Sequence, residues 1–291
     1  MARSGIIDFH THTFPDRIAA GAVSVLREKS HSAAFSDGTE SGLAESAKKA
    51  GITRCVVLPV ATSPRQVAHI NDSSIRIAET AAETGLTSLG CMHPDDENWS
   101  AELERIARAG LRGIKLHPVY QGVDMDDARM VRILSRCGEL GLFVLIHAGL
   151  DIGFPGAEQA APEKIRRALD QSGPVRLVAA HMGGWRCWDE AADLLGPLPN
   201  VMIDTAFSLG RITPLGDGYP WTPEGLQMLT PADFVRLVRA WGADRVLFGT
   251  DSPWADQGEA LREFTALPLT EQEKRAILWE NGAELLGMQT A

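Results

Sequence analysis

The chain has 291 residues, a formal net charge of −10 and 44% hydrophobic residues. Such an acidic chain lacks the basic surface of proteins that bind nucleic acid or anionic membranes. Its composition is that of an ordinary globular enzyme, and no apolar run approaches the roughly 18 residues of a membrane span. The N-terminus passes directly into a strand-like segment without a secretory signal. We therefore expect a cytoplasmic protein with neither nucleic-acid nor membrane partners.

Short apolar runs alternate with longer stretches of helical period along the chain. The runs predict eight strands, at residues 5–10, 54–60, 86–91, 112–117, 142–147, 175–181, 201–205 and 245–251. The intervening stretches predict helices at residues 40–50, 67–83, 97–109, 126–140, 162–171 and 231–241, with a closing helix at 271–286. Strands that alternate with helices imply a parallel sheet, and eight of them close a (β/α)8 barrel, the TIM-barrel fold.

An open, doubly wound sheet is the competing architecture, but it usually has a glycine-rich phosphate loop after its first strand. Here the first strand ends in His10-Thr11-His12, which favours the barrel. No linker or low-complexity tract divides the chain, so we predict one domain over residues 1–291. The connections at residues 13–39 and 206–230 are predicted to be long functional loops, because both follow strand ends where barrel enzymes place their active sites.

Ionisable residues collect at the C-terminal ends of the predicted strands. They are His10, His12, Lys115, His117, His147, His181 and Asp251. In a barrel these strand ends converge on one rim, so the residues become neighbours. His10 and His12 are separated by one residue and share a strand face, so both imidazoles can reach one ion. Imidazole suits zinc, manganese, iron or nickel, and a carboxylate adds charge, so the pattern predicts a metal centre.

Five segments together resemble the amidohydrolase superfamily. They are IDFHTH at residues 7–12, GIKLHP at 113–118, IHAG at 146–149, AHMGG at 180–184 and FGTDSP at 248–253. Within the superfamily, the chain is most similar to the amidohydrolase-2 branch, which contains aminocarboxymuconate-semialdehyde decarboxylase. The resemblance spans nearly the whole chain and implies a metal-dependent barrel enzyme. It does not identify the substrate, because the branch includes decarboxylases as well as hydrolases of lactones and amides.

The resemblance also implies roles for individual residues. His10, His12, His147 and Asp251 correspond to metal ligands. The expected occupant is one zinc ion, with manganese, iron, nickel or a second ion as alternatives. His181 corresponds to a histidine that is an acid/base catalyst in one-metal members and a ligand in two-metal members. Because Asp251 can also accept a proton from a metal-bound water, His181 and Asp251 are the predicted catalytic residues.

Lys115 is open to several interpretations. In two-metal relatives a lysine at this strand end is carboxylated and bridges the ions, whereas decarboxylase-like members usually lack it. An ammonium beside a metal is costly, since both are cations. Lys115 is therefore expected to bind a substrate carboxylate, to pair with Asp8, or to be the carboxylated ligand. His117 has the same strand parity and either binds substrate or braces the turn at Pro118.

Two further residues are predicted to contact the substrate. Trp254, three residues after Asp251, can form the wall of a pocket for a planar molecule, and Arg186 can bind a carboxylate. A resemblance to TatD-type nucleases, which share the H-x-H start, is set aside. Those enzymes have a metal-binding glutamate where this chain has Lys115, and the negative net charge offers no surface that attracts DNA.

Three functions from different classes follow. The first is hydrolysis of an amide, ester or lactone bond of a small molecule by metal-activated water. The alternative is non-oxidative decarboxylation of a small unsaturated or aromatic acid. The third is a non-catalytic protein that binds metal or ligand, which the additional His181 argues against. The resemblance also implies a homodimer.

Overall fold

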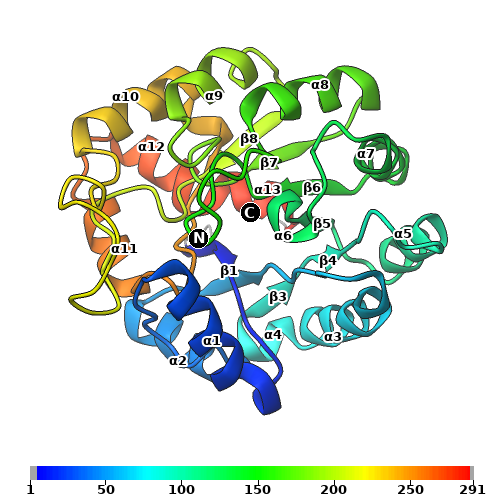
Figure 1. Ribbon diagram of the computed structural model, residues 1–291, viewed down its shortest axis with the longest axis horizontal. Coiled ribbons are helices and arrows are strands. Elements are labelled where there is room, and N and C mark those ends of the chain that lie inside the picture. Colours follow the sequence, from blue (N-terminus) through cyan, green and yellow to red (C-terminus); the bar gives the residue numbers. More distant parts are fainter. Residues whose placement is uncertain (1–4, 289–291) are drawn as a thin grey trace.

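The computed structural model describes residues 5–288. The expected lack of a secretory signal rests partly on residues 1–4, which lie outside the described residues. Parallel strands surrounded by helices form a (β/α)8 barrel, as predicted (Figure 1). Among residues 5–288, no helix is both long enough and apolar enough to cross a membrane.

The strands follow one another around the barrel in chain order, and all pairs are parallel. They are β1 (Ile7–Thr11), β2 (Arg54–Val57), β3 (Leu86–Ser88), β4 (Gly90–Cys91), β5 (Gly113–Leu116), β6 (Phe143–Ile146), β7 (Leu177–Ala179), β8 (Val201–Asp204) and β9 (Val246–Leu247). The predicted strand at 86–91 is divided at Leu89 into β3 and β4. The described strands therefore occupy the eight predicted positions.

The first and last strands close the barrel through backbone hydrogen bonds. Phe9 N donates to Phe248 O over 2.7 Å. Asp251 N donates to His10 O over 2.8 Å, and His12 N donates to Ser252 O over 2.7 Å. This seam brings the first and last of the five motifs, at residues 7–12 and 248–253, into direct contact, although they lie about 240 residues apart in the chain.

The helices cover the outside of the barrel (Figure 1). They are α1 (Asp16–Ser30), α2 (Glu40–Ala50), α3 (Val67–Glu79), α4 (Ala81–Thr84), α5 (Trp99–Arg108), α6 (Pro118–Gln121), α7 (Ala128–Leu140), α8 (Pro162–Ser172), α9 (Trp188–Leu195), α10 (Pro231–Trp241), α11 (Gln257–Thr265), α12 (Glu271–Arg275) and α13 (Asn281–Leu285). Short helical turns occupy Pro64–Gln66, Ala243–Arg245 and Ala276–Glu280.

The connection at residues 13–39 is not a loop throughout, because it contains α1. Sequence periodicity missed this helix because only Ala19, Val23 and Ser30 of its residues are buried, which leaves a weak apolar stripe. The helices α9 and α11 were missed as well. The connection at residues 206–230 does lack a helix, and isolated bridges such as Leu209 with Leu229 hold it together.

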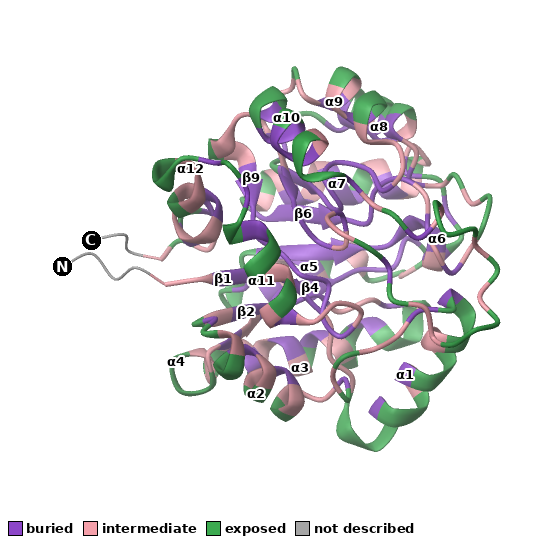
Figure 2. Cartoon of the chain, turned by 90° about the vertical axis from the view of Figure 1, so that its left-hand side faces the viewer, coloured by how far each residue is buried: buried purple, intermediate pink, exposed green. Residues whose placement is uncertain are grey.

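Two apolar layers stabilise the barrel, and Figure 2 shows the buried residues concentrated along its strands. The larger layer packs the strands against the surrounding helices. The smaller one fills the barrel interior with side chains such as Phe9, Phe143 and Leu145. Ala283 and Leu285 of α13 join this inner layer, so the last helix covers the end of the barrel opposite the strand C-termini.

Gly113 marks a close approach between β5 and β6. A methyl group at this position would lie 2.5 Å from the carbonyl oxygen of Phe143 and 2.9 Å from its ring. Real Cβ atoms do not tolerate such distances, and a strand backbone cannot move without disturbing its ladder. Gly216 is a contrasting position, since it is exposed and a methyl group there would have no neighbour within 4 Å.

We predict that Gly113→Ala lowers the free energy of unfolding by about 1–3 kcal/mol, because the added methyl group overpacks the barrel interior. Urea unfolding followed by circular dichroism measures the effect. Gly216→Ala is the matched control and should leave the midpoint unchanged or slightly raised. Equal midpoints for the two variants would contradict the packing described here.

Candidate metal centre

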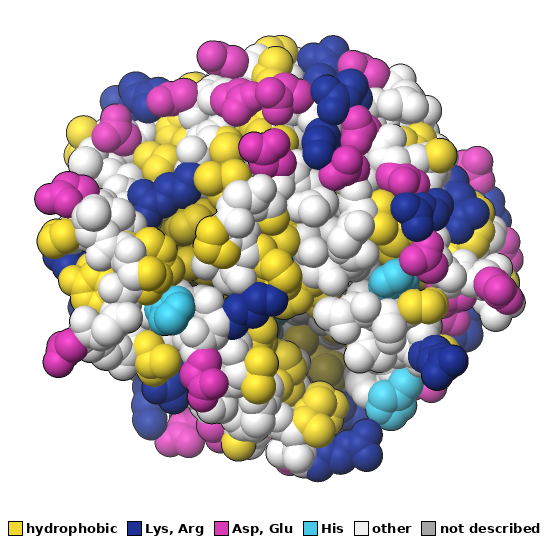
Figure 3. All heavy atoms as spheres, in the orientation of Figure 1, with side chains coloured by type: hydrophobic (Ala, Val, Ile, Leu, Met, Phe, Trp, Pro, Cys, Tyr) yellow, Lys and Arg dark blue, Asp and Glu magenta, His cyan; other side chains and the backbone are white. Residues whose placement is uncertain are grey.

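The predicted site residues meet in one cavity of about 840 Å³ at the C-terminal end of the barrel. This cavity is lined by His10, His12, Lys115, His117, His147, His181, Asp251 and Trp254, among others. In Figure 3, which looks onto this end of the molecule, the surface is hollowed and apolar side chains border the hollow. The convergence predicted from the strand ends is therefore present in the structure.

A β-bulge in β1 sets the direction of its histidines. Asp8 pairs with Cys55 and Thr11 pairs with Val57, so one extra residue of β1 is accommodated between these pairs. As a result, Phe9 faces the barrel interior and the next residue, His10, does so too. His12 then lies on the same side as His10, as the spacing predicted.

The bulge turns Asp8 away from the cavity. Its carboxylate accepts hydrogen bonds from the Thr250 hydroxyl (2.6 Å), the Thr250 N–H (2.9 Å) and the Gln257 amide (2.7 Å). The predicted pairing of Asp8 with Lys115 is therefore wrong. A one-residue bulge reverses the face of every side chain before it, and the sequence pattern gave no sign of it.

His10 and His12 each donate one ring N–H to a fixed oxygen. His10 Nδ1 lies 2.7 Å from Asp204 Oδ2, and His12 Nδ1 lies 2.8 Å from the Leu58 carbonyl. These oxygens accept, so each ring keeps a lone pair on Nε2. The two Nε2 atoms lie 3.4 Å and 3.1 Å from Asp251 Oδ1.

His147 and His181 follow the same rule with backbone carbonyls. His147 Nε2 lies 3.0 Å from Leu150 O, and His181 Nδ1 lies 3.0 Å from Ala206 O. Their remaining nitrogens, His147 Nδ1 and His181 Nε2, face each other at 3.1 Å. Two lone pairs at this distance repel, so the arrangement favours a proton or a cation next to them. The ligand atoms of His10, His12 and Asp251 lie within 4.8 Å of one another, so this donor set fits a divalent ion.

The electrostatics of the site favour neutral imidazoles, which is the form that binds a metal. Burial lowers the pKa of His147 to about 3 and that of His181 to about 4. Burial also lowers the pKa of His10 well below its usual value. For Asp251, burial opposes ionisation, but the positive charge that His12, His10 and His181 carry when protonated outweighs it and holds the pKa of this carboxyl below its usual range.

Lys115 is almost fully buried at the same strand end. Burial lowers its pKa to about 8, and the charges of Asp204, Asp251 and Asp151 limit that decrease. Among the described residues, no carboxylate oxygen lies within 4.0 Å of its ammonium nitrogen. At neutral pH the lysine thus keeps most of its charge without a direct ion pair, and it faces the cavity.

His117 and Asp151 form a second polar group in the cavity. The His117 and His147 rings stack with centroids 4.3 Å apart and planes 8° from parallel. His117 Nδ1 accepts the Tyr120 N–H at 3.4 Å, which leaves the proton on Nε2, 3.6 Å from Asp151 Oδ2. The ligand atoms of His117, His147 and Asp151 are close enough together to hold an ion. The proton on His117 Nε2 instead favours a polar contact between His117 and the Asp151 carboxylate.

Two acidic residues of the site were not assigned to it from the sequence. Asp204 ends β8 and orients His10, and its other oxygen accepts the backbone N–H groups of His181 (2.9 Å) and Ala206 (3.1 Å). Asp151 lies four residues after His147 and is buried. An acidic residue shortly after a strand that ends in histidine was the available signal for Asp151.

Arg186 is not in the cavity lining. It donates to Gln227 O (2.6 Å) and Gly225 O (2.7 Å), and its guanidinium lies over the rings of Trp185 and Trp188. Both terminal nitrogens are thus engaged in holding the connection at residues 206–230. The prediction that Arg186 binds a substrate carboxylate does not fit this placement.

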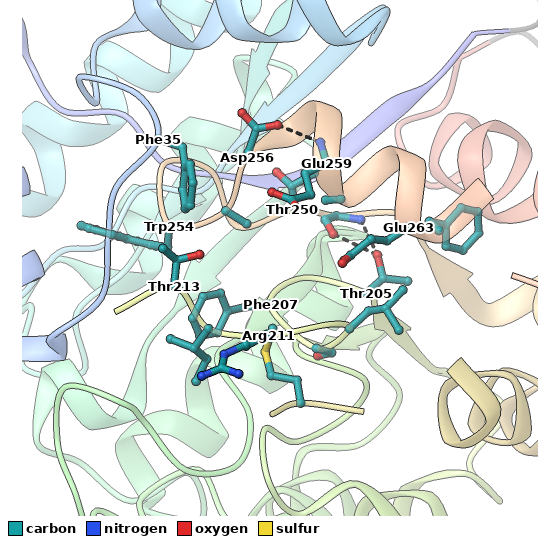
Figure 4. Close-up of a pocket in the computed structure, with 18 of the residues that line it drawn as sticks. Phe35, Thr205, Phe207, Arg211, Thr213, Thr250, Trp254, Asp256, Glu259 and Glu263 are labelled. Atoms are coloured by element: carbon teal, nitrogen blue, oxygen red, sulfur yellow. Dashed lines mark hydrogen bonds between the residues drawn. The ribbon is translucent and has the colours of Figure 1, made fainter. Parts of the chain in front are cut away.

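Trp254 lies between the main cavity and a smaller one of about 390 Å³. Phe207 also borders both. Figure 4 shows Phe207, Trp254 and Phe35 on one side of the smaller cavity and Glu263 across from them. The two aromatic side chains therefore separate the site from a pocket beside α11.

Comparison with known proteins identifies the family. A family model described as amidohydrolase matches residues 7–288. The chain belongs to this amidohydrolase family. The resemblance seen in the five motifs, and with it the amidohydrolase-2 branch, is thereby confirmed. No curated protein matches this amidohydrolase.

Solved structures share the fold of this amidohydrolase. An uncharacterized TIM-barrel protein from Bordetella bronchiseptica is 20% identical with a TM-score of 0.74, over 97% of this chain and 98% of its own. A 5-carboxyvanillate decarboxylase from Sphingomonas paucimobilis is 16% identical with a TM-score of 0.65, over 98% and 100%. A dihydroxybenzoic acid decarboxylase from Polaromonas sp., solved with manganese and the inhibitor 2-nitroresorcinol, is 15% identical with a TM-score of 0.67, over 98% and 97%.

We predict that Asp204→Asn weakens divalent-metal binding by about 10–100-fold. The backbone N–H groups of His181 and Ala206 would donate to the oxygen of the new asparagine amide, so its nitrogen would face His10 Nδ1. That nitrogen can only donate, which moves the His10 proton to Nε2 and removes its lone pair from the site. Competition with a chromogenic chelator measures the affinity. Asp217→Asn, in the exposed connection, should bind as the wild type does, and unchanged affinity in Asp204→Asn would contradict the proposed orientation.

Proposed function

We propose that the protein is a metal-dependent enzyme that removes the carboxyl group of a small aromatic or unsaturated acid without oxidation. The observation that carries this proposal is the set of His10, His12 and Asp251, whose metal-binding atoms all lie within 4.8 Å of one another. The His181 ring lies beside His10, and His147 lies beside His181. The decarboxylases of similar fold support it, although their low identity establishes only the fold by itself.

His10, His12, His147 and Asp251 would hold the metal. Zinc, expected from the sequence, and manganese, present in a structural neighbour, both accept imidazole and carboxylate ligands. When bound, a divalent ion supplies positive charge that attracts and orients the substrate's oxygen atoms. His181 lies in contact with His147 and is the remaining imidazole of the group, so we assign it to proton transfer and not to permanent ligation.

The chain's own residues provide the other requirements of the reaction. Lys115 offers a buried ammonium that attracts a carboxylate into the cavity. When carbon dioxide leaves, the carbon that carried it must receive one proton. We assign this transfer to His181 Nε2, whose free lone pair takes the proton from an acidic group of the substrate and passes it to that carbon. Trp254, Phe207 and Trp185 form an apolar wall that limits access of water to this carbon.

Hydrolysis of an amide, ester or lactone bond was the first expectation from the sequence. The same centre suits that chemistry, since an activated water and an acid/base histidine are its main requirements. We prefer decarboxylation because the two neighbours named above that have a stated activity are decarboxylases. Assays on both kinds of substrate separate the two reactions.

We expect the manganese-loaded protein to release carbon dioxide from at least one member of a panel of hydroxylated benzoic acids. His181→Ala should lower kcat by about 10²–10⁴-fold while retaining bound metal, because it removes the group that transfers the proton and none of the proposed ligands. Gas release and metal analysis measure the two properties together. His31→Ala, at an exposed histidine, is the control. Loss of metal in His181→Ala would show that this residue is a ligand. Turnover of lactones but not of acids would support hydrolysis and contradict decarboxylation.

A further inference from the structure

The main cavity extends well beyond the candidate metal centre. One face of α3 lines it over more than two turns, through His69, Ile70, Ser73, Ser74 and Ile77. This spacing of one, three and four residues is that of a single helix face. From His69 to Ile77 the helix rises about 12 Å at 1.5 Å per residue. The cavity therefore has an arm that follows α3 away from the strand ends.

The opposite walls of this arm are mainly apolar. Ile18 and Leu26 come from α1, and Val57 comes from β2. In Figure 1, α1, α2 and α3 lie together on the side of the barrel formed by the first strands. The arm thus runs between α1 and α3, with hydroxyl groups of serine as its main polar contribution on α3.

The charged groups along the arm lie at its edge or are already paired. Arg76 forms an ion pair with Glu40 at 2.6 Å. Arg17 and His69 are exposed, so they mark the rim where the cavity meets solvent. Ile18 is 49% exposed at the same place, which leaves an apolar side chain open to water until something covers it.

The volume is also much larger than one aromatic ring requires. A cavity of about 150 Å³ accommodates benzene. The cavity of about 840 Å³ is more than five times as large. A single-ring acid held at the strand ends would leave the arm between α1 and α3 without apolar contacts.

We infer that the substrate of this site is an amphipathic acid, in which a long apolar substituent such as an alkyl chain extends from the ring into the arm between α1 and α3. The inference rests on the proposed function, because it takes the carboxyl end to lie at Lys115 and the imidazole cluster. The chain would pack against Ile18, Leu26 and Ile70 and cover the exposed part of Ile18.

The test is a binding series with the manganese-loaded protein. The probes are 2,6-dihydroxybenzoates that carry a 4-alkyl chain from methyl to hexyl, and calorimetry measures Kd. Each methylene buried in the arm should tighten Kd about fourfold. A Kd that does not change with chain length would overturn the inference.

A variant that fills this part of the cavity provides a second test. Ser73→Phe places a ring on the cavity face of α3 and should abolish the chain-length dependence, while Kd for the methyl probe stays within about twofold. Ala68→Phe adds the same ring to an exposed position of α3 outside the cavity lining and should behave as the wild type. An unchanged chain-length dependence in Ser73→Phe would also overturn the inference.

Carbon dioxide release from the same probes separates this inference from the proposed function. Tighter binding of long chains without release of carbon dioxide would uphold the amphipathic ligand and overturn decarboxylation. Release from the methyl probe with no gain in affinity along the series would uphold decarboxylation and overturn the long substituent.

Discussion

The site depends on the seam where the first strand meets the segment after the last one. Three backbone hydrogen bonds cross it within 2.8 Å, and the buried Asp8 carboxylate adds bonds to Thr250 and Gln257. Because His10 and Asp251 lie on opposite sides of this seam, closing the barrel and assembling the centre are the same event. A barrel that stayed open here would keep every ligand residue in its sequence and lose the centre.

The second constraint is the proton on each ring. An imidazole offers a lone pair to a metal only from the nitrogen that carries no proton, and a hydrogen bond to the other nitrogen decides which one that is. In the four histidines, the position of the ring proton is set by four acceptors. They are the Asp204 carboxylate and the backbone carbonyls of Leu58, Leu150 and Ala206. The surrounding backbone is therefore as much part of the centre as the histidines.

The extent to which the sequence predicts this structure differs from residue to residue. The strands and the histidines at their ends follow from local patterns, because apolar runs and short motifs are carried by adjacent residues. The bulge at Asp8 and the orienting role of Asp204 depend on contacts with residues tens to hundreds of positions away. The sequence did not predict the helix α1, because few of its side chains are buried. It assigned Arg186 to the substrate because the carbonyl groups that Arg186 contacts belong to an irregular connection, which no local pattern predicts.

The backbone at two site residues has a thermodynamic consequence. Asp251 has a φ of 72° and His181 a φ of 60°, in the left-handed region that residues other than glycine adopt at a cost of about 1 kcal/mol or more each. Glycine at either position would relieve this strain and remove a group that the chemistry requires. Selection for stability alone would thus favour glycine at both positions and remove the site, so at these two residues the fold is less stable than it could be because the chemistry needs the side chains.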